Sequence, residues 1–502
     1  MKEGALHELP GGWVREYLDN ISLKITDGEH FRPRIISSGI PFLSAKDVRD
    51  EGILLDDAFC ISEEDAKKFR NKCDPEIGDI LIVSRGATVG RSCIVTNDRK
   101  FCLLGSVILI KLHSTLSNKF ISYIIKSTNI KKQLVGLSGS TAQQAIYIRD
   151  IRKISISLPP LPEQRAIVSK IEQLFSDLDN GIENFKEAQA QLKLYRQSVL
   201  KAACEGKLVP IEAELARAEG RDYETADVLL ARILKEQREK WNGKGKYKEA
   251  AVLDINGLTE LPEGWVWANV GMISEKIQYG TSEKAGEDNS GIPVLRMGNI
   301  QDGKLIFENL KYFQKDWPEL SNFLLEDGDV LFNRTNSAEL VGKTSVYKNW
   351  QTPTVFASYL IRVIVIKSAY TPDFLSFFIN SIFGRKYIGS VVSQQVGQAN
   401  VNGTKLSKMP IPLPPLAEQR RIVAEVERRL SVSDKMEATI TESLQKAESL
   451  RQSILKKAFE GKLLNEKEME EARNASDWES AEKLLERIRQ EKALIGEKKR
   501  NR

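Results

Sequence analysis

The chain has 502 residues, of which 41% are hydrophobic and 28% are charged, and its formal net charge is +5. This length suits three or four folded units rather than one. No apolar run reaches the length of a membrane span and the N-terminus shows no signal-peptide core, so we expect a soluble, cytoplasmic protein.

The first globular part is predicted over residues 1–157, where Gly, Ser, Asn and β-branched residues are frequent. Within it, Ile80–Val83 and Val107–Ile110 are short apolar runs typical of buried strands, and Phe120–Ile125 is predicted as a short helix. Lys and Arg number 23 here against 19 Asp and Glu. Bulk charge therefore does not indicate a nucleic-acid surface, and any such surface depends on local placement.

A helical region is predicted over residues 158–256. A long helix begins after Pro159–Pro160, because a residue that precedes proline disfavours helical geometry, and it ends at Gly206, as a C-cap glycine would end it. About 43 residues at about 1.5 Å each span roughly 65 Å. Its apolar residues recur every three or four positions, which indicates a heptad-like stripe: Ile167, Ile171, Leu174, Leu178, Ile182, Phe185, Leu192 and Val199. A shorter helix follows from Ala226.

The same order then repeats in a second globular part, residues 257–412, and a second helical region, residues 413–502. A buried strand is predicted over Leu360–Ile366 and a short helix over Phe374–Ile379. A second long helix begins after Pro414–Pro415, ends at Gly461 and precedes a shorter helix. In the second globular part, 15 Lys and Arg balance 15 Asp and Glu.

Internal repetition is the strongest signal in the chain. LPPLPEQRAIV from Leu158 returns as LPPLAEQRRIV from Leu413, and RQSVLKAACEGKL from Arg196 returns as RQSILKKAFEGKL from Arg451, both at an offset of 255 residues. LPGGWV from Leu9 returns as LPEGWV at an offset of 252. Two stripes of equal length are most economically buried against each other in antiparallel orientation. We therefore predict an α+β protein with pseudo-twofold organisation, in which an antiparallel coiled coil joins two mixed α/β modules. A twofold object suits a twofold partner such as duplex DNA.

Motifs for catalysis are absent from the sequence. The three histidines are too scattered for a metal cluster. VGKTS (Val341–Ser345) resembles the end of a phosphate loop, but Ser337 stands where the first glycine is required. The sequence contains no Asn-Pro-Pro-aromatic methyltransferase tetrapeptide and no G-x-S-x-G. The five cysteines form no C-x-x-C pair and are expected to be reduced structural thiols. We expect a non-catalytic chain with no metal or cofactor of its own.

The repeated LPPLxEQR and RQS–EGKL segments, together with the LPxGWV openings, resemble the specificity subunit of type I restriction–modification systems over nearly the whole chain. The resemblance implies two target-recognition domains that each read half of a split DNA target. It also implies a coiled-coil spacer that docks two methyltransferase subunits, and two motor-nuclease subunits in the complete enzyme. Those partners would use S-adenosylmethionine, ATP and Mg²⁺, and the base modified would be adenine at N6.

Polar loop groups are the candidate DNA contacts, because Arg and Lys suit phosphates and guanine, and Asn and Gln suit adenine. Each globular part offers three such groups and one residue in the segment after its GIP tripeptide. In the first part the candidates are His30, Arg32, Arg34, Lys46, Ser84, Arg85, Thr88, Arg91, Gln143 and Gln144. In the second they are Thr281, Ser282, Lys284, Arg296, Arg334, Asn336, Lys343, Gln394, Gln395, Gln398 and Asn400. The alternative interpretation is an ordinary surface turn for the first group, a structural hairpin for the second and a hydrogen-bonded linker for the third.

The two globular parts differ from each other more than the helical regions do, which suggests half-sites of different sequence and an asymmetric target. Three alternatives stay open. The chain could be a self-contained restriction–methylation enzyme, although the missing motifs oppose it. It could be a coiled-coil adaptor without DNA binding, or a silent or phase-variable specificity chain.

Overall fold

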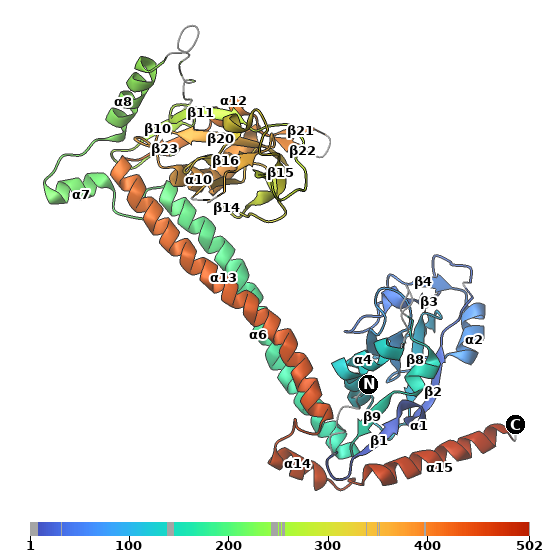
Figure 1. Cartoon of the computed structure of the whole chain (residues 1–502). Helices are drawn as coiled ribbons and strands as arrows, with labels where there is room; N and C mark the ends of the chain where they lie inside the picture. Colours follow the sequence, from blue (N-terminus) through green and yellow to red (C-terminus); the bar gives the residue numbers. More distant parts are fainter. Residues whose placement is uncertain are drawn as a thin grey trace. The chain divides into compact units, whose positions relative to one another are not determined.

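The computed structural model describes residues 9–31, 33–137, 145–241, 249, 251, 253, 257–337, 339–348, 350, 352–395 and 398–500 (Figure 1). The chain forms two compact units: unit 1 combines residues 1–185 with 441–502, and unit 2 is residues 186–440. Each unit therefore contains one globular module and part of each long helix. We call residues 9–157 the first module and 257–412 the second. The bounds of the four predicted segments stay predictions.

The first module is built on two sheets that share a core. The larger sheet is antiparallel in the order β2 (Ser22–Asp27), β8 (Val107–Leu112), β5 (Ile80–Val83) and β6 (Ser92–Ile94). The smaller has the order β4 (Phe59–Ile61), β3 (Ile40–Leu43) and β7 (Cys102–Leu103). All four residues of β5 are buried, because Ile80 and Ile82 face one hydrophobic cluster and Leu81 and Val83 face another. The continuous apolar run therefore marks a strand covered on both faces.

Short helices complete this module around the sheets. α3 (Asn118–Lys126) packs its apolar face into the same cluster as Ile80 and contains the predicted helix at Phe120–Ile125. The helices are α1 (Leu18–Ile21), η1 (Ala45–Asp47), α2 (Glu63–Lys72), α3 (Asn118–Lys126), α4 (Thr128–Leu137) and α5 (Ile148–Arg152). A separate antiparallel pair, β1 (Val14–Tyr17) with β9 (Ser155–Leu158), joins the start of the module to its end.

The second module repeats this topology. Its larger sheet has the order β11 (Ser274–Tyr279), β20 (Leu360–Val365), β16 (Val330–Asn333) and β18 (Thr344–Val346), and its smaller sheet has the order β15 (Lys311–Phe313), β12 (Ile292–Leu295) and β19 (Val355–Phe356). β10 (Val266–Asn269) pairs with β23 (Pro410–Leu413) as β1 does with β9. The strand predicted from Leu360 and the helix predicted from Phe374 are confirmed.

Two small sheets add to this core. β13 (Ile300–Gln301) and β14 (Lys304–Leu305) form a hairpin, and β17 (Thr335–Asn336), β22 (Gln398–Asn400) and β21 (Ser393–Gln395) form a three-stranded sheet. The helices of the second module are η2 (Met297–Asn299), α9 (Leu320–Phe323), α10 (Pro372–Asn380), α11 (Ile382–Val391) and α12 (Gly403–Ser407).

The long helices α6 (Leu161–Cys204) and α13 (Leu416–Phe459) have 44 residues each and lie side by side (Figure 1). In unit 2, Arg196 of α6 pairs with Asp434 of α13 at 2.7 Å. In unit 1, Arg451 of α13 pairs with Asp179 of α6. Arg451 is the repeat of Arg196 and Asp434 is the repeat of Asp179, so one ion pair is made twice with the helices exchanged. The N-terminal part of each helix thus meets the C-terminal part of the other, and the predicted antiparallel coiled coil is confirmed.

The repeated motifs meet one another at the ends of the long helices. In unit 2, Trp265 of LPEGWV donates its indole N–H to the buried Glu418 of LPPLAEQR at 3.0 Å. The side chain of Gln419 accepts a hydrogen bond from the Thr371 backbone N–H at 2.9 Å, which caps α10. In unit 1, Trp13 donates to Glu163 at 2.6 Å and Gln164 accepts from Ser117 N–H at 3.0 Å. The motif therefore joins a long helix to its module.

The shorter helices extend this exchange. α7 (Glu212–Glu219) and α8 (Ala226–Glu239) follow α6, while α14 (Glu466–Arg473) and α15 (Ala481–Arg500) follow α13. Ala226 N–H donates to Gly264 O in unit 2, and Ala481 N–H donates to Gly12 O in unit 1, both at 3.0 Å. α15 consequently packs on the first module and α8 on the second, although α15 is the last helix of the chain.

Within the described part of the chain, no helix combines the length and apolar character needed to cross a bilayer. All five cysteines are free thiols, and four of them are buried. Burial raises the pKa of Cys73 and of Cys93 to about 12, which keeps both thiols protonated and unreactive at neutral pH.

Candidate DNA interface

One edge of the larger sheet in the first module collects the predicted loop groups. β2 ends at Asp27 opposite Ile108, and β5 ends at Val83 opposite Val107, so the loops that follow these two strands leave the sheet at the same edge. The group at His30 follows β2 and the group at Ser84 follows β5. Residues after the third group return to this edge, because Ile146 N–H donates to Ser84 O at 2.8 Å. Loop groups far apart in sequence are thus brought together.

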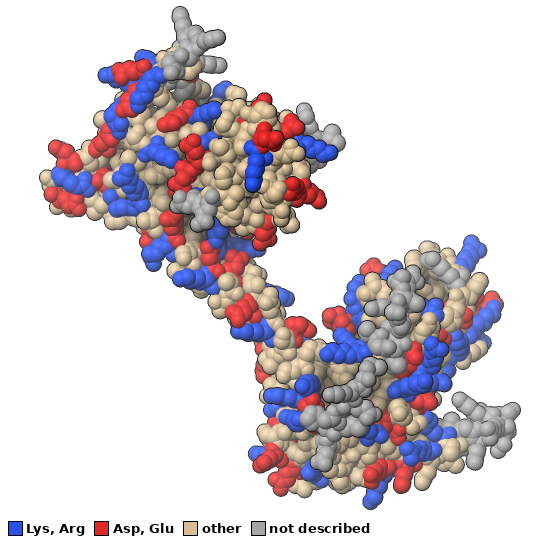
Figure 2. Space-filling model, in the orientation of Figure 1, with Lys and Arg blue, Asp and Glu red and all other residues tan. Residues whose placement is uncertain are grey.

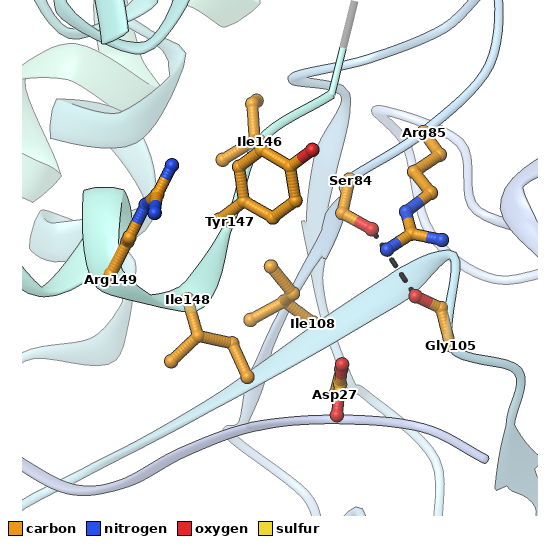
Figure 3. A pocket seen from close by; sticks show the side chains of 9 residues that line it. All are labelled: Asp27, Ser84, Arg85, Gly105, Ile108, Ile146, Tyr147, Ile148 and Arg149. Atoms are coloured by element: carbon orange, nitrogen blue, oxygen red, sulfur yellow. Dashed lines mark hydrogen bonds between the residues drawn. The ribbon is translucent and has the colours of Figure 1, made fainter. Parts of the chain in front are cut away.

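A pocket of about 280 Å³ opens at this edge (Figure 3). Three isoleucines form its apolar part, and Arg85 and Arg149 lie on opposite sides of it in Figure 3. Its lining residues are Asp27, Ser84, Arg85, Gly105, Ile108, Ile146, Tyr147, Ile148 and Arg149. Apolar and charged side chains therefore line the same open hollow.

Asp27 carries the negative charge of this pocket. Its carboxylate lies 2.8 Å from the His30 ring Nε2 and 3.1 Å from the Lys72 ammonium. Partial burial raises the pKa of Asp27, but the hydrogen bonds and charges of Lys72 and His30 outweigh burial and leave the pKa below its usual value. The carboxylate is therefore ionised at neutral pH and holds the His30 ring and the Lys72 ammonium beside the pocket.

The predicted residues of the first module differ in accessibility. Ser84 is only 3% exposed and its hydroxyl donates to Gly105 O at 3.4 Å, so it supports the loop rather than presenting a group to solvent. Arg85 is exposed. Thr88 and Arg91 are half-buried, and the Arg91 N–H donates to Thr88 O at 3.1 Å in a turn.

The other first-module candidates lie around the same loops. His30, Arg34 and Lys46 are exposed. The Lys46 ammonium lies 4.4 Å from the centre of the Phe59 ring, a cation–π contact that holds it on β4. Arg32, Gln143 and Gln144 lie outside the described residues.

The second module builds the equivalent edge with different side chains. Tyr279 ends β11, where the first module has Asp27, and the Arg334 guanidinium lies 4.8 Å from the centre of its ring. The hydroxyl of Tyr279 accepts a hydrogen bond from the Gly403 N–H at 2.6 Å. A bulky ring and a stacked cation therefore occupy the position at which the first module has a carboxylate and a pocket.

The second and third loop groups of this module are joined directly. Asn336 lies on β17 and pairs with Ala399 of β22, and the Asn400 side chain donates to the Thr335 hydroxyl at 2.8 Å. Gln394, Gln395 and Gln398 lie on β21 and β22, and their side chains are outside the described residues. The predicted glutamine-rich group thus forms a small sheet with the arginine loop.

Several second-module candidates hold the structure. Thr281 is 7% exposed and its hydroxyl accepts from Glu283 N–H at 3.1 Å. The Arg296 guanidinium donates to Asn309 O at 2.7 Å, which braces a turn. Lys343 is half-buried at 3.9 Å from Asp302. Ser282 and Lys284 are exposed.

Sequence reasoning missed Tyr147 and Arg149. The Tyr147 ring is 44% exposed, and the Arg149 guanidinium carbon lies 5.0 Å from its centre at the pocket. An exposed aromatic ring beside arginine suits contact with a base or a phosphate. Both residues follow Gln144 closely in the sequence, so extending the third loop group to the start of α5 would have included them.

Surface charge is mixed in both units. Figure 2 shows cationic and anionic side chains interspersed over the visible face of each unit. This distribution agrees with the near balance of charges in the two globular parts of the sequence. Binding of a polyanion would therefore depend on local groups at the loop edge rather than on a strong overall field.

Comparison with known proteins identifies the family. The profile described as "Type I restriction modification DNA specificity domain" matches residues 34–187 and 262–446. The EcoKI specificity subunit of Escherichia coli (strain K12) is 26% identical over 99% of this chain and 98% of its own length. The StySPI specificity subunit of Salmonella potsdam is also 26% identical, over 99% and 98%.

Solved structures share the fold. A chain from a study of assembly and conformational transition in the type I R-M system has a TM-score of 0.64 at 18% identity, covering 91% of this chain and 100% of its own. The HsdS subunit of Thermoanaerobacter tengcongensis has a TM-score of 0.51 at 19% identity, covering 91% and 99%. The chain belongs to the type I restriction–modification DNA specificity family, as a specificity subunit.

Proposed function

We propose that this subunit binds a bipartite, asymmetric duplex target, with each module reading one half-site through its loop edge. The observation that carries the proposal is the duplication of that edge with different side chains. Both modules carry an arginine just after the equivalent strand: Arg334 is the first residue after β16, and Arg85 is the second residue after β5. The neighbouring position is Asp27 in one module and Tyr279 in the other. Two edges of one topology and different chemistry suit two half-sites of different sequence.

Exposed groups at each edge are the proposed contacts. In the first module, His30, Arg34 and Arg85 are accessible cations or polar rings, and Tyr147 with Arg149 adds a stacking surface. Arginine supplies a bidentate donor for guanine or a charge for phosphate. Buried Ser84 acts indirectly, because it shapes the loop that carries Arg85.

The second module offers a different set. Arg334 and Asn336 follow β16, and the strands carrying Gln394, Gln395 and Gln398 lie beside them. Asparagine and glutamine pair bidentately with adenine. Exposed Ser282 and Lys284 would contact the DNA backbone, whereas Thr281 and Arg296 support the loops.

The helix pair is proposed as the ruler of the target and as the docking surface for partners. Half-sites on one face of B-DNA lie about one helical turn, roughly 34 Å, apart, and a rigid pair of helices holds such a gap where a flexible linker would not. Two methyltransferase subunits and two motor-nuclease subunits would assemble on the helical regions. S-adenosylmethionine, ATP and Mg²⁺ would be used by those subunits, and adenine N6 would be the atom methylated. This chain would supply recognition without catalysis.

A base-resolution methylome tests the proposal. Cells that carry this chain with its methyltransferase are compared with cells that lack the chain. The expected result is a split, asymmetric methylated motif with a fixed gap that disappears on deletion. An unchanged methylome, together with no DNA retention by the purified complex, would favour an adaptor without DNA binding.

Single-module variants then assign the half-sites. Arg85→Ala and Arg334→Ala each remove a cation from the loop after the equivalent strand, one residue apart in register, so each serves as the control for the other. Each variant is expected to relax discrimination in one half of the motif and to leave the other half intact. Equal effects of both variants on both halves would contradict the division of labour between modules.

A further inference from the structure

The second module contacts helix α13 through two ion pairs that lie seven residues apart. The Lys348 ammonium bridges Asp373 of α10 at 2.6 Å and Glu427 of α13 at 2.9 Å. Lys304 pairs with Asp434 of α13. Seven residues are about two helical turns, so Glu427 and Asp434 lie on one face of α13, roughly 10 Å apart. Two contacts along one face resist rotation of the module in a way that a single contact does not.

Lys304 is carried by a rigid arm rather than by a loose loop. It follows the two-residue turn Asp302–Gly303, whose positive φ angles of 48° and 78° match the tight turn preferred between antiparallel strands. The Ser345 hydroxyl donates to Gly303 O at 3.0 Å, and the Asn299 side chain donates to Ile306 O at 2.8 Å. The turn of the β13–β14 hairpin is therefore fixed to β18, and the base of the hairpin is closed by a hydrogen bond between its two flanks.

Asp434 is shared between the module and both long helices. Besides Lys304, it pairs with Arg196 of α6 at 2.7 Å, and Arg196 also pairs with Glu437 at 2.8 Å. Partial burial raises the pKa of Asp434, but the hydrogen bonds and charges of Lys304 and Arg196 prevail and leave the pKa below its usual value. The carboxylate stays charged, and three elements meet at one residue.

This contact lies beyond the apolar packing of the module on α13. The hydrophobic core of the second module takes in Ile422, Val426 and Leu430 of that helix. Asp434 is one turn further along. A contact at the far end of an interface has the longest lever arm, so it limits tilting of the module more than an equal contact near the centre.

Unit 1 provides a natural comparison. The counterpart of the Lys348–Glu427 pair is present there: Lys119 of the first module pairs at 2.7 Å with Glu172 of α6, which is the repeat of Glu427. Asp179, the repeat of Asp434, pairs with Arg451. Among the described residues, Asp179 has no ion pair with a cation of the first module. Where the second module reads QDGK, the first reads RDEG, so Gly52 stands at the position of Lys304 and the cation Arg49 stands at the position of Gln301.

We propose that Lys304 and Asp434 are positioning residues that fix the angle of the second module on the helix pair and thereby hold the gap between the half-sites. The inference rests on the proposed function. Helix length sets the gap between the half-sites to within a few base pairs. The Lys304–Asp434 ion pair then suppresses binding to targets whose gap is slightly shorter or longer. One partly exposed ion pair is worth about a three- to fivefold change in selectivity.

The test measures methylation rates of the assembled complex on duplexes that carry both half-sites at the native gap and at gaps one base pair shorter or longer. Lys304→Met and Asp434→Asn are expected to raise the relative rate at the altered gaps about three- to fivefold. Lys304→Arg keeps the positive charge and should retain the wild-type selectivity for the native gap. Asp179→Asn is the matched control, because it breaks the equivalent helix–helix pair, and it should leave selectivity unchanged.

Each result bears on the inference separately from folding. Thermal unfolding of the variants checks that they are intact, since Lys304 is an exposed side chain at the surface. Wild-type gap selectivity in Lys304→Met, or an equal loss in Asp179→Asn, would overturn the positioning role while leaving the two-part target standing. A wild-type complex with no two-part target would overturn the proposed function and this inference together.

Discussion

Gly206 is the position where two repeated motifs touch, and its substitution by alanine should destabilise unit 2. Gly206 follows α6 with φ of +67°, and a Cβ atom there would lie 2.5 Å from Cγ of Pro262 and 3.2 Å from the ring of Trp265. Pro262 cannot move aside easily, because its ring is rigid and its carbonyl accepts a hydrogen bond from the Trp265 backbone N–H at 3.1 Å. The EGKL motif therefore needs glycine for contact as well as for backbone conformation.

Gly220 supplies the matched control in the same unit. Its φ is +65° at the end of α7, and nothing lies within 4 Å of a Cβ atom built there. Alanine in the left-handed region costs roughly 1–2 kcal/mol at either position. Overlap with packed atoms adds about 1–3 kcal/mol at Gly206 alone. The difference between the variants, about 2 kcal/mol, corresponds to about 4–8 °C in the melting temperature of a unit of this size.

Thermal unfolding of the full chain, followed by tryptophan fluorescence, measures this difference. Both substitutions lie in unit 2, so they affect the same transition. Gly206→Ala is expected to melt clearly below Gly220→Ala, which should melt slightly below the wild type. Equal melting temperatures for the two variants would refute the packing argument, because only backbone strain would then be at work.

Three further outcomes are expected. Burial raises the pKa of Glu418 from 4.5 to about 7, so as the pH rises the unfolded chain loses this proton first. The unfolding free energy of unit 2 should therefore fall by up to about 3 kcal/mol between those pH values. Urea titrations at several pH values should show no such fall in Glu418→Gln, and a fall that persists in this variant would mean that another group causes it. Replacing Arg85 and Arg91 together by alanine should weaken only the half-site read by the first module, as gel-shift competition with half-site mutants would show; unaltered affinity would remove that loop from the contacts. Excising seven matching residues from both long helices shortens the helix pair by about 10 Å. The methylated motif should then have a gap about three base pairs shorter, with both half-sites unchanged. Altered half-sites would contradict the spacer role.

Several features follow from the sequence alone, because they depend on local periodicity or on the repeat. The long helices are predicted by apolar residues that recur every three or four positions and by the C-cap glycines Gly206 and Gly461. The strand at Ile80–Val83 is a short apolar run. The offset of 255 residues predicts that whatever contact one copy makes, the other repeats, and the Arg196–Asp434 and Arg451–Asp179 pairs do so.

Tertiary structure decided which polar residues are available. Ser84 and Thr281 belong to the same polar loops as Arg85 and Lys284, yet the first two are buried and the last two are exposed. Burial of a hydroxyl depends on a carbonyl or N–H that another segment provides, as Gly105 O does for Ser84. A local pattern does not contain that information.

The exchange of helices between halves was likewise beyond local pattern. The last helix, α15, completes the first module because Ala481 bonds Gly12, 469 positions earlier in the chain. Glu163 and Glu418 look like ordinary first-turn acids, but each is buried as the acceptor of a tryptophan N–H. Sequence by itself determined the elements and their duplication, since these arise from short-range geometry. Only long-range packing decided which copies meet, because the free energy of such contacts belongs to pairs of segments and not to either segment alone.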